Sequence, residues 1–208
     1  MNLALQQLDI WQYLILLGSY LLGSFPTGYL LGKYVYKINL FEHGSKNVGA
    51  TNSLRVLGKK AGLTVLLIDA LKGALPVVCI NNFTQLGFNW SIAVGFLAIF
   101  GHTFSPFIKF KGGKGVATSA GTFLALIPIV FASAMAVFFS TVAITRYVSL
   151  GSILASATLP IACYFIHSQS PILWQSCLLL SIFIIYKHRS NIKRLIDGKE
   201  NKFSWSKR

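Results

Sequence analysis

A polar stretch near the start of the chain, residues 41–62, carries the densest set of side chains suited to substrate binding. It reads FEHGSKNVGATNSLRVLGKKAG, and its glycines let backbone N–H groups fold around an anion beside Ser45, Asn47 and Asn52. Arg55 adds a planar guanidinium that can hold a phosphate through two parallel hydrogen bonds. An ordinary polar connector is the alternative, but most connections run to about 4–6 residues. The length and composition therefore predict an anion-binding loop.

A second glycine loop, residues 110–115, reads FKGGKG and leads directly into an apolar segment. A helix beginning near Val116 would present unpaired N–H groups and the positive end of its dipole to an anion. The sequence predicts substrate binding by five consecutive residues: Lys111, Gly112, Gly113, Lys114 and Gly115. The spacing is not that of a GxxxxGK[ST] nucleotide-binding loop. The alternative is that the lysines only anchor the chain at the cytoplasmic membrane face.

Two later segments carry further candidate residues. RYVSLGS, residues 146–152, offers the hydroxyl of Ser149, for which capping of the following helix is the alternative role. KHRSNIKRLIDGKEN, residues 187–201, places His188 and Asn191 three residues apart, so a helix would put both on one face. This pair could orient a substrate hydroxyl. A basic tail at the membrane surface would explain the lysines and arginines but not the pair.

Asp69 and Lys72 stand three residues apart inside an apolar run, where an unpaired charge costs roughly 2.5–3.5 kcal/mol. We therefore expect a structural ion pair within a helix bundle, and we expect His102 to be a packed ring rather than a catalyst. The sequence lacks the HxxxxD pair of many acyltransferases, because none of its four histidines has aspartate five residues later. The cysteines show no metal-ligand spacing, so no metal site is predicted.

The composition indicates what must position these residues. The chain has 208 residues, of which 54% are hydrophobic and only 12% charged, and its mean hydropathy is +0.62. A globular protein carries about 25% charged residues, so lipid must serve as the solvent for this chain. The formal charge of +14 does not indicate nucleic-acid binding, because the basic residues lie in the gaps between apolar runs. We expect one integral membrane domain over residues 1–208, without a nucleic-acid partner.

Apolar runs of about 20 residues are long enough to cross a bilayer. Pro128 would kink a helix through residues 116–145, so that stretch is divided in two. The sequence then predicts an all-α integral membrane protein with seven transmembrane helices, at about 10–32, 62–80, 89–108, 116–127, 128–145, 149–167 and 171–187. Basic residues follow the first, third, fifth and seventh spans, which places the N-terminus outside and the C-terminus in the cytoplasm. An unbroken 116–145 helix would give six spans and put Arg146 and the C-terminal basic cluster on opposite sides.

In chain order, these segments resemble the bacterial acyl-phosphate:glycerol-3-phosphate acyltransferases. The resemblance runs from Gly23 to Lys202 and rests on GSFPTGYLLGK (23–33), HGSKNVGATNSLRVLGKKAG (43–62), DALKGALPV (69–77), GHTFSPFIKFKGGKGVAT (101–118), RYVSLGS (146–152) and HRSNIKRLIDGKEN (188–201). Several motifs in this order are far more specific than any one of them. The chain differs from the usual family pattern at residues 39–41, which read Asn-Leu-Phe instead of Asp-Ile-Arg, and at Lys46, which replaces a glycine.

The resemblance implies a single-domain, multi-pass enzyme of the bacterial cytoplasmic (inner) membrane with its active site open to the cytoplasm. It implies transfer of a fatty acyl group from acyl-phosphate to the 1-hydroxyl of glycerol-3-phosphate, giving lysophosphatidic acid and phosphate for phospholipid biosynthesis. Neither a cofactor nor a metal is expected, and we expect a monomer. The matching positions imply catalytic roles for Ser45, Ser149, His188 and Asn191, and substrate binding by Arg55, Asn47, Asn52, Lys111, Gly112, Gly113, Lys114, Gly115 and Glu200.

Two other classes of protein would also carry basic glycine loops. A transporter for an organic phosphate would need polar residues along a path, yet the outer halves of the spans are almost wholly apolar. A non-catalytic binder of anionic lipid would explain the basic loops but not the serine, asparagine and histidine residues beside them. An acyl-phosphate is a mixed anhydride with a good leaving group, so a positioned hydroxyl could attack it without a dedicated His–Asp base.

Overall fold

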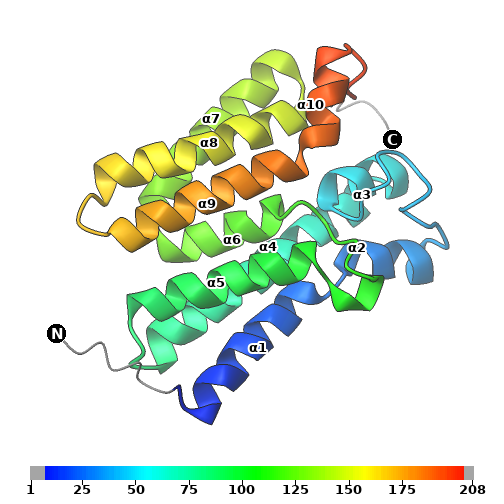
Figure 1. Ribbon diagram of the computed structural model, residues 1–208. Helices are drawn as coiled ribbons and strands as arrows, with labels where there is room; N and C mark the ends of the chain where they lie inside the picture. The colour runs from blue at the N-terminus through cyan, green and yellow to red at the C-terminus, as the bar shows by residue number, and fades with distance from the viewer. Residues whose placement is uncertain (1–7, 204–208) are drawn as a thin grey trace.

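The computed structural model describes residues 8–203, which form helices joined by loops, without a strand (Figure 1). The all-α prediction is therefore confirmed for this part of the chain. The predicted outer N-terminal segment up to residue 7, and Lys207 and Arg208 of the predicted cytoplasmic basic tail, lie outside the described residues.

Within residues 8–203, the long helices are α1 (Ile10–Ser24), α4 (Lys59–Phe83), α5 (Phe88–Thr103), α7 (Pro128–Thr145), α8 (Val148–Ile166) and α9 (Pro171–Lys187). The shorter elements are α2 (Thr27–Leu30), the π-helical turn η1 (Leu31–Val35), α3 (Ala50–Leu57), the 3₁₀ turn η2 (Pro106–Ile108), α6 (Val116–Leu126) and α10 (Arg189–Ile196). From α6 to α9 the helix limits lie within one residue of the predicted spans. Pro128 is the first residue of α7, as predicted, because a helix start needs no N–H at that position.

The lengths of the helices decide which of them can cross a bilayer alone. Helices α4, α7 and α8, and α5 with η2, are each long and apolar enough. Two bent pairs, α1 with α2 and η1, and α9 with α10, bring the number to six if each pair is one span. Helix α6 has 11 residues and reaches about 16 Å at about 1.5 Å per residue, against about 30 Å for the hydrocarbon core. The described residues therefore support four to six full spans, and seven spans with the N-terminus outside stay a prediction.

The first predicted span, 10–32, is not one continuous helix. Helix α1 ends at Ser24, and the chain bends by 40° before continuing through α2 and η1. The reason is Pro26, which lacks an N–H and disfavours the helical conformation at the residue before it; Phe25 accordingly has φ −56° and ψ 115°. The break exposes a backbone carbonyl inside the bundle, where it needs a polar partner.

Helices α4 and α6 pack at close range because two glycines remove the side chains between them. A Cβ on Gly73 would lie 2.1 Å from the carbonyl oxygen of Thr118, and one on Gly121 would lie 1.9 Å from that of Ala70. The hydroxyl of Thr122 also donates to the Gly73 carbonyl over 3.1 Å. Small residues at such contacts are how helices associate in lipid. The contact fixes α6, and the glycine loop at its N-terminus, against α4.

The two ends of the bundle differ in composition. Side chains from the helices α4 to α9 form the apolar core. In contrast, α2, α3, α10 and the loop before α6 gather at one end of the long helices (Figure 1). The polar segments predicted to face the cytoplasm are at this end, and the α4–α5 and α8–α9 turns are at the other. The predicted loop 41–62 contains α3 and the first turn of α4. The irregular segment between η1 and α3 is residues 36–49.

Candidate functional site

The C-terminal segment brings three predicted site residues to the polar end of the bundle. Helix α10 follows α9 at a bend of 57°, and His188 and Asn191 are both buried, as expected for one face of a helix. Gly198, at φ 65°, then turns the chain back, and the N–H of Phe203 donates over 2.7 Å to the turn between α7 and α8. This return places Glu200 beside α10 and the start of α8.

Glu200 is the centre of a hydrogen-bond network that joins α8, α10 and the loop before α6. Its Oε1 accepts from Asn191 Nδ2 at 2.9 Å and from Ser149 Oγ at 3.0 Å. Its Oε2 accepts from Arg194 Nε at 2.6 Å. Lys114 Nζ donates to the Oδ1 atom of Asn191. Burial alone would raise the pKa of Glu200, but these hydrogen bonds outweigh it and lower the pKa, so the carboxylate is ionised at neutral pH.

The charges around this network do not cancel. Arg55, Lys114 and Arg194 lie within electrostatic range of one another and of Glu200, so three cations surround one carboxylate. Burial, and then the charge of Arg194, lower the pKa of Lys114 to about 8, so most of its ammonium groups are still charged at pH 7. Crowded cations repel one another, and a phosphate dianion would relieve that repulsion while accepting charge-assisted hydrogen bonds.

The imidazole of His188 is oriented so that it can accept a hydrogen bond. Its Nδ1 lies 2.8 Å from the carbonyl oxygen of Ile184. A carbonyl can only accept, so Nδ1 carries the proton and Nε2 carries the lone pair. Burial, and then the positive charge of Lys114, lower the pKa of His188 to about 4. The ring is therefore neutral at pH 7, able to hold a hydroxyl group but weak as a base.

The first predicted loop is shaped by Asn52, whose side chain is engaged within the protein. Its Oδ1 accepts from the backbone N–H of Ser45 at 2.8 Å. Its Nδ2 donates toward the carbonyl oxygens of Leu40, His43 and Asn47, at 3.4, 3.1 and 2.8 Å. A buried amide that is used in this way holds the loop together, and substrate binding by Asn52 stays a prediction.

The other predicted residues of this loop differ in their surroundings. The side-chain oxygen of Asn47 accepts from the N–H of Gly49 at 3.0 Å and closes a turn. Ser45 is half-buried, and Arg55 is exposed on α3. The structure thus places Arg55 in a cationic cluster with Lys114 and Arg194, and it gives Asn47 a contact within the loop.

The second predicted loop packs its two central glycines against the end of α5. The N–H of Gly112 donates to the Thr103 carbonyl, and that of Gly113 to the His102 carbonyl, both over 3.1 Å. A Cβ on Gly112 would lie 2.0 Å from the carbonyl oxygen of His102, and one on Gly113 would lie 2.0 Å from its ring Nε2. These two glycines pack closely against the end of α5, and the predicted approach of their backbone to a ligand stays a prediction.

The end of the same loop is the part that reaches the cluster. Gly115 adopts φ 86°, a conformation that favours glycine, and turns the chain into α6 directly after Lys114. The first N–H groups of a helix have no partner within it, and the helix dipole adds positive potential there. Lys111 is exposed and is not part of the Glu200 network.

Arg194 is the cluster residue that the sequence analysis missed. It lies three residues after Asn191 on α10, the same spacing that put His188 and Asn191 on one face. The helical periodicity was the available signal.

Known proteins share the sequence and fold of this chain over nearly its full length. Residues 13–198 match the glycerol-3-phosphate acyltransferase family. A glycerol-3-phosphate acyltransferase of Trichlorobacter lovleyi is 50% identical over 188 residues, which are 89% of this chain and 94% of that protein. The crystal structure of PlsY, an integral membrane glycerol 3-phosphate acyltransferase, in its glycerol 3-phosphate form matches with a TM-score of 0.85 at 35% identity, covering 93% of this chain and 96% of that one. The lysophosphatidic acid form of PlsY matches over the same shares with a TM-score of 0.81.

Proposed function

Since the chain belongs to the glycerol-3-phosphate acyltransferase family, we propose that it moves a fatty acyl group from acyl-phosphate to the 1-hydroxyl of glycerol-3-phosphate. The products are lysophosphatidic acid and inorganic phosphate, in phospholipid biosynthesis. The family predicted from the sequence motifs is confirmed. The two forms in which PlsY was crystallised, with glycerol 3-phosphate and with lysophosphatidic acid, support the proposed acceptor and product. The proposal includes a monomer in the bacterial cytoplasmic membrane, with its active site facing the cytoplasm.

The observation that carries the proposal is the excess of positive charge around Asn191 and Glu200. Both proposed substrates carry phosphate, and phosphates pair most strongly with guanidinium and ammonium groups in a partly buried site. Arg55, Lys114 and Arg194 provide three such groups within electrostatic range of one another. A protein that only binds anionic lipid would need the charge, but not a neutral imidazole and a serine hydroxyl beside it.

The reaction follows from the arrangement of these groups. The 1-hydroxyl oxygen attacks the carbonyl carbon of acyl-phosphate, and the bond from that carbon to the phosphate oxygen breaks. His188 Nε2 accepts the hydrogen bond of the attacking hydroxyl and fixes its direction, while Asn191 and Ser149 border the same space. Holding the reactants in this geometry replaces strong activation of the nucleophile.

The proton of the hydroxyl passes to the departing phosphate. With a pKa of about 4, His188 is too weak a base to take it for long. Phosphate has a second pKa near 6 in its esters and leaves beside the hydroxyl, so it is the better acceptor. Lys114 and Arg194 stabilise the negative charge that develops on the phosphate oxygens.

We propose different roles for the remaining predicted residues, from direct contact with the substrate to support of the loops. We assign Ser45 and Arg55 to contact with a substrate phosphate, and Gly115 to presenting the first N–H groups of α6 to it. Asn47 and Asn52 contribute by shaping the loop. Lys111 adds positive potential at the rim of the site, and Gly112 and Gly113 act through packing of the glycine loop.

The test is product formation by the purified protein in detergent. Incubation with palmitoyl-phosphate and glycerol-3-phosphate should release lysophosphatidic acid and inorganic phosphate in equal amounts, and omission of the acceptor should abolish the lipid product. Protein with Lys114→Ala serves as the site control and should show a strongly reduced rate. Binding of both compounds without product would identify a lipid binder. Movement of glycerol-3-phosphate into proteoliposomes without product would identify a transporter.

A further inference from the structure

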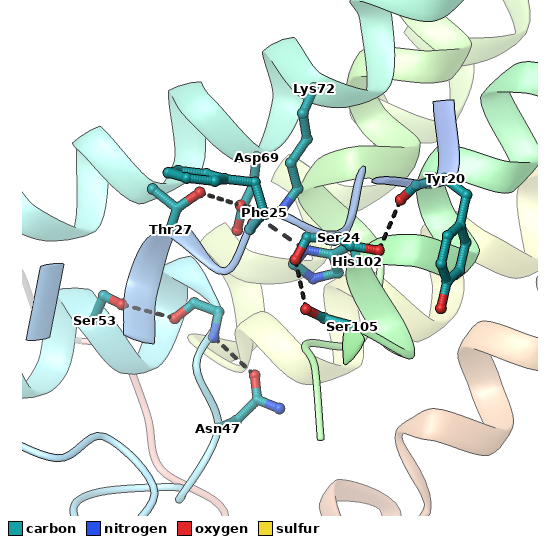
Figure 2. A network of polar contacts seen from close by, with 11 residues as sticks. Tyr20, Ser24, Phe25, Thr27, Asn47, Ser53, Asp69, Lys72, His102 and Ser105 are labelled. Atoms are coloured by element: carbon teal, nitrogen blue, oxygen red, sulfur yellow. Dashed lines mark hydrogen bonds and ion pairs between the residues drawn. The ribbon is translucent and has the colours of Figure 1, made fainter. Parts of the chain in front are cut away.

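A buried ionic network in the bundle lies near the first predicted substrate loop, in which Figure 2 labels Asn47. The carboxylate of Asp69 in α4 accepts a hydrogen bond from Thr27 Oγ1 at 3.0 Å and pairs with Lys72 Nζ at 2.7 Å. Lys72 also donates over 2.7 Å to the Phe25 carbonyl, which the helix break leaves inside the bundle. The His102 ring packs beside the same carboxylate, with its Nδ1 3.8 Å from that oxygen, which is too far for a hydrogen bond. The predicted ion pair is confirmed, and its partners extend to two further elements.

One branch of the network reaches the first loop through α2. Thr27 is the first residue of α2, and a Cβ on the next residue, Gly28, would lie 1.9 Å from the carbonyl oxygen of Val48. The backbone of α2 is therefore in direct contact with the first loop at Val48, the residue that follows Asn47 (Figure 2). Asp69 holds Thr27, so it also sets where α2 supports this loop.

The other branch reaches the second loop through His102. The ring of His102 is buried at the end of α5, with Nδ1 toward Asp69 and Nε2 against Gly113. The backbone carbonyl of the same residue accepts the N–H of Gly113. Lys114, which enters the cationic cluster, follows directly. Rotation or loss of this ring would change the distance between the backbone of the glycine loop and the end of α5.

We propose that Asp69 and His102 are positioning residues for substrate binding, and that one carboxylate in α4 sets both loops. The first loop is set through Thr27 and α2, and the second through the His102 ring beneath Gly113. This inference rests on the proposed function, because it takes the two loops to carry groups that bind phosphate. A buried ion pair contributes little net stability, which is consistent with a role in geometry.

The second branch is tested by a pair of changes that should compensate each other. Gly113→Ala would place a methyl group 2.0 Å from His102 Nε2 and lift the loop. The KM for glycerol-3-phosphate should rise by between about tenfold and about a hundredfold, the cost of a misplacement of about 1 Å. Adding His102→Ala to Gly113→Ala makes room for the methyl group, so the double variant should have a lower KM than Gly113→Ala alone. Losses that add in the double variant would overturn the proposal, because Gly113 would then be needed for direct approach of the substrate.

The first branch is tested by Thr27→Val, which keeps the shape of the side chain and removes its hydrogen bond to Asp69. The matched control is Thr158→Val on α8, a half-buried threonine whose hydroxyl donates to the Leu154 carbonyl. Each purified full-length protein is characterised by its thermal midpoint and its steady-state kinetics. Thr27→Val should raise the KM for glycerol-3-phosphate about tenfold, and the control should leave it unchanged. A lower midpoint with an unchanged KM would mean a purely structural role and would overturn the proposal.

A third arm separates this proposal from the function on which it rests. Lys114→Ala removes a cation of the cluster itself and should raise the KM for glycerol-3-phosphate. If Lys114→Ala has no effect, the proposed phosphate site is wrong, whatever the loop variants do. If Lys114→Ala raises the KM while Thr27→Val and Gly113→Ala do not, the site stands and the positioning role is wrong.

Discussion

At the scale of single residues, burial leaves two neighbouring groups in different charge states at neutral pH. Burial lowers the pKa of both, to about 4 for His188 and to about 8 for Lys114. At pH 7 the imidazole is then neutral and can accept a hydrogen bond, whereas the ammonium is mostly charged and can bind phosphate. The sequence motifs identified both residues, but not these protonation states, because burial depends on how α9, α10 and the glycine loop pack.

The pKa of Lys114 predicts the alkaline limb of the pH profile. A lysine is charged below its pKa, so kcat/KM for glycerol-3-phosphate should fall as the pH rises through about 8. Lys114→Arg, which stays charged at far higher pH, should move the limb upward by more than one unit even if its maximal rate is lower. The profile is measured from pH 6 to 9.5, with blanks for spontaneous hydrolysis of the donor. An identical limb in the arginine variant would exclude Lys114 as its source.

At the scale of elements, short helices were harder to predict than long ones. The apolar runs and Pro128 placed α6 to α9 within one residue, because length and hydropathy are local properties. The short helix α3 was not predicted within the loop 41–62, because its stability depends on packing against other elements. The break at Pro26 was also missed, although the proline is a local signal for it. Glu200 was expected from the family motif alone, and only the turn at Gly198 brings it to Ser149 and α10.

The face of α10 gives a prediction with a built-in control. Arg194 is bonded to Glu200 and lies in the cationic cluster, whereas Lys193, its neighbour of equal charge, is exposed. Arg194→Ala should raise the KM for a phosphorylated substrate about tenfold or more, since hydrogen bonds to charged groups contribute about 1.5–3 kcal/mol and 1.4 kcal/mol is tenfold. Lys193→Ala should leave the KM unchanged. Equal effects of the two changes would mean that only the net charge of the tail matters.

The contact between α4 and α6 predicts a contrast between two glycines. Gly121→Ala would place a Cβ 1.9 Å from the Ala70 carbonyl, so α6 must shift, at a cost of about 1–3 kcal/mol or more for overpacking. Among the described residues, no atom lies within 4 Å of a Cβ on Gly18, in the middle of α1. Gly18→Ala should therefore keep or slightly raise the thermal midpoint, and Gly121→Ala should lower it. A midpoint unaffected by Gly121→Ala would contradict the packing described for α4 and α6.

At the scale of the whole molecule, the fold collects polar segments from both halves of the sequence at one end of an apolar bundle (Figure 1). The positive-inside rule predicts that this end faces the cytoplasm, as the proposed function requires. The sequence predicted this division into a polar end and an apolar body. It could not predict the buried network of Asp69, because the partners of that residue come from α2 and α5.

The orientation in the membrane is tested by labelling engineered cysteines in intact cells. A cysteine at Gln85, in the exposed α4–α5 turn, should react with a membrane-impermeant maleimide from outside. A cysteine at the exposed Lys111 should react only after the cells are opened. Labelling of both positions from the same side would contradict the seven-span topology and the cytoplasmic site.

The choice of acyl donor tests the central claim most directly, since a site of cations without a His–Asp base requires a donor that brings its own good leaving group. Purified protein in excess EDTA is offered glycerol-3-phosphate with either palmitoyl-phosphate or palmitoyl-CoA, and lysophosphatidic acid is quantified. Arg55, Lys114 and Arg194 supply the positive charge without a metal ion, so we expect full turnover with palmitoyl-phosphate in EDTA. Because the site offers no strong base, we expect none with palmitoyl-CoA. Comparable rates with the CoA thioester, or loss of turnover in EDTA, would contradict this account of the site.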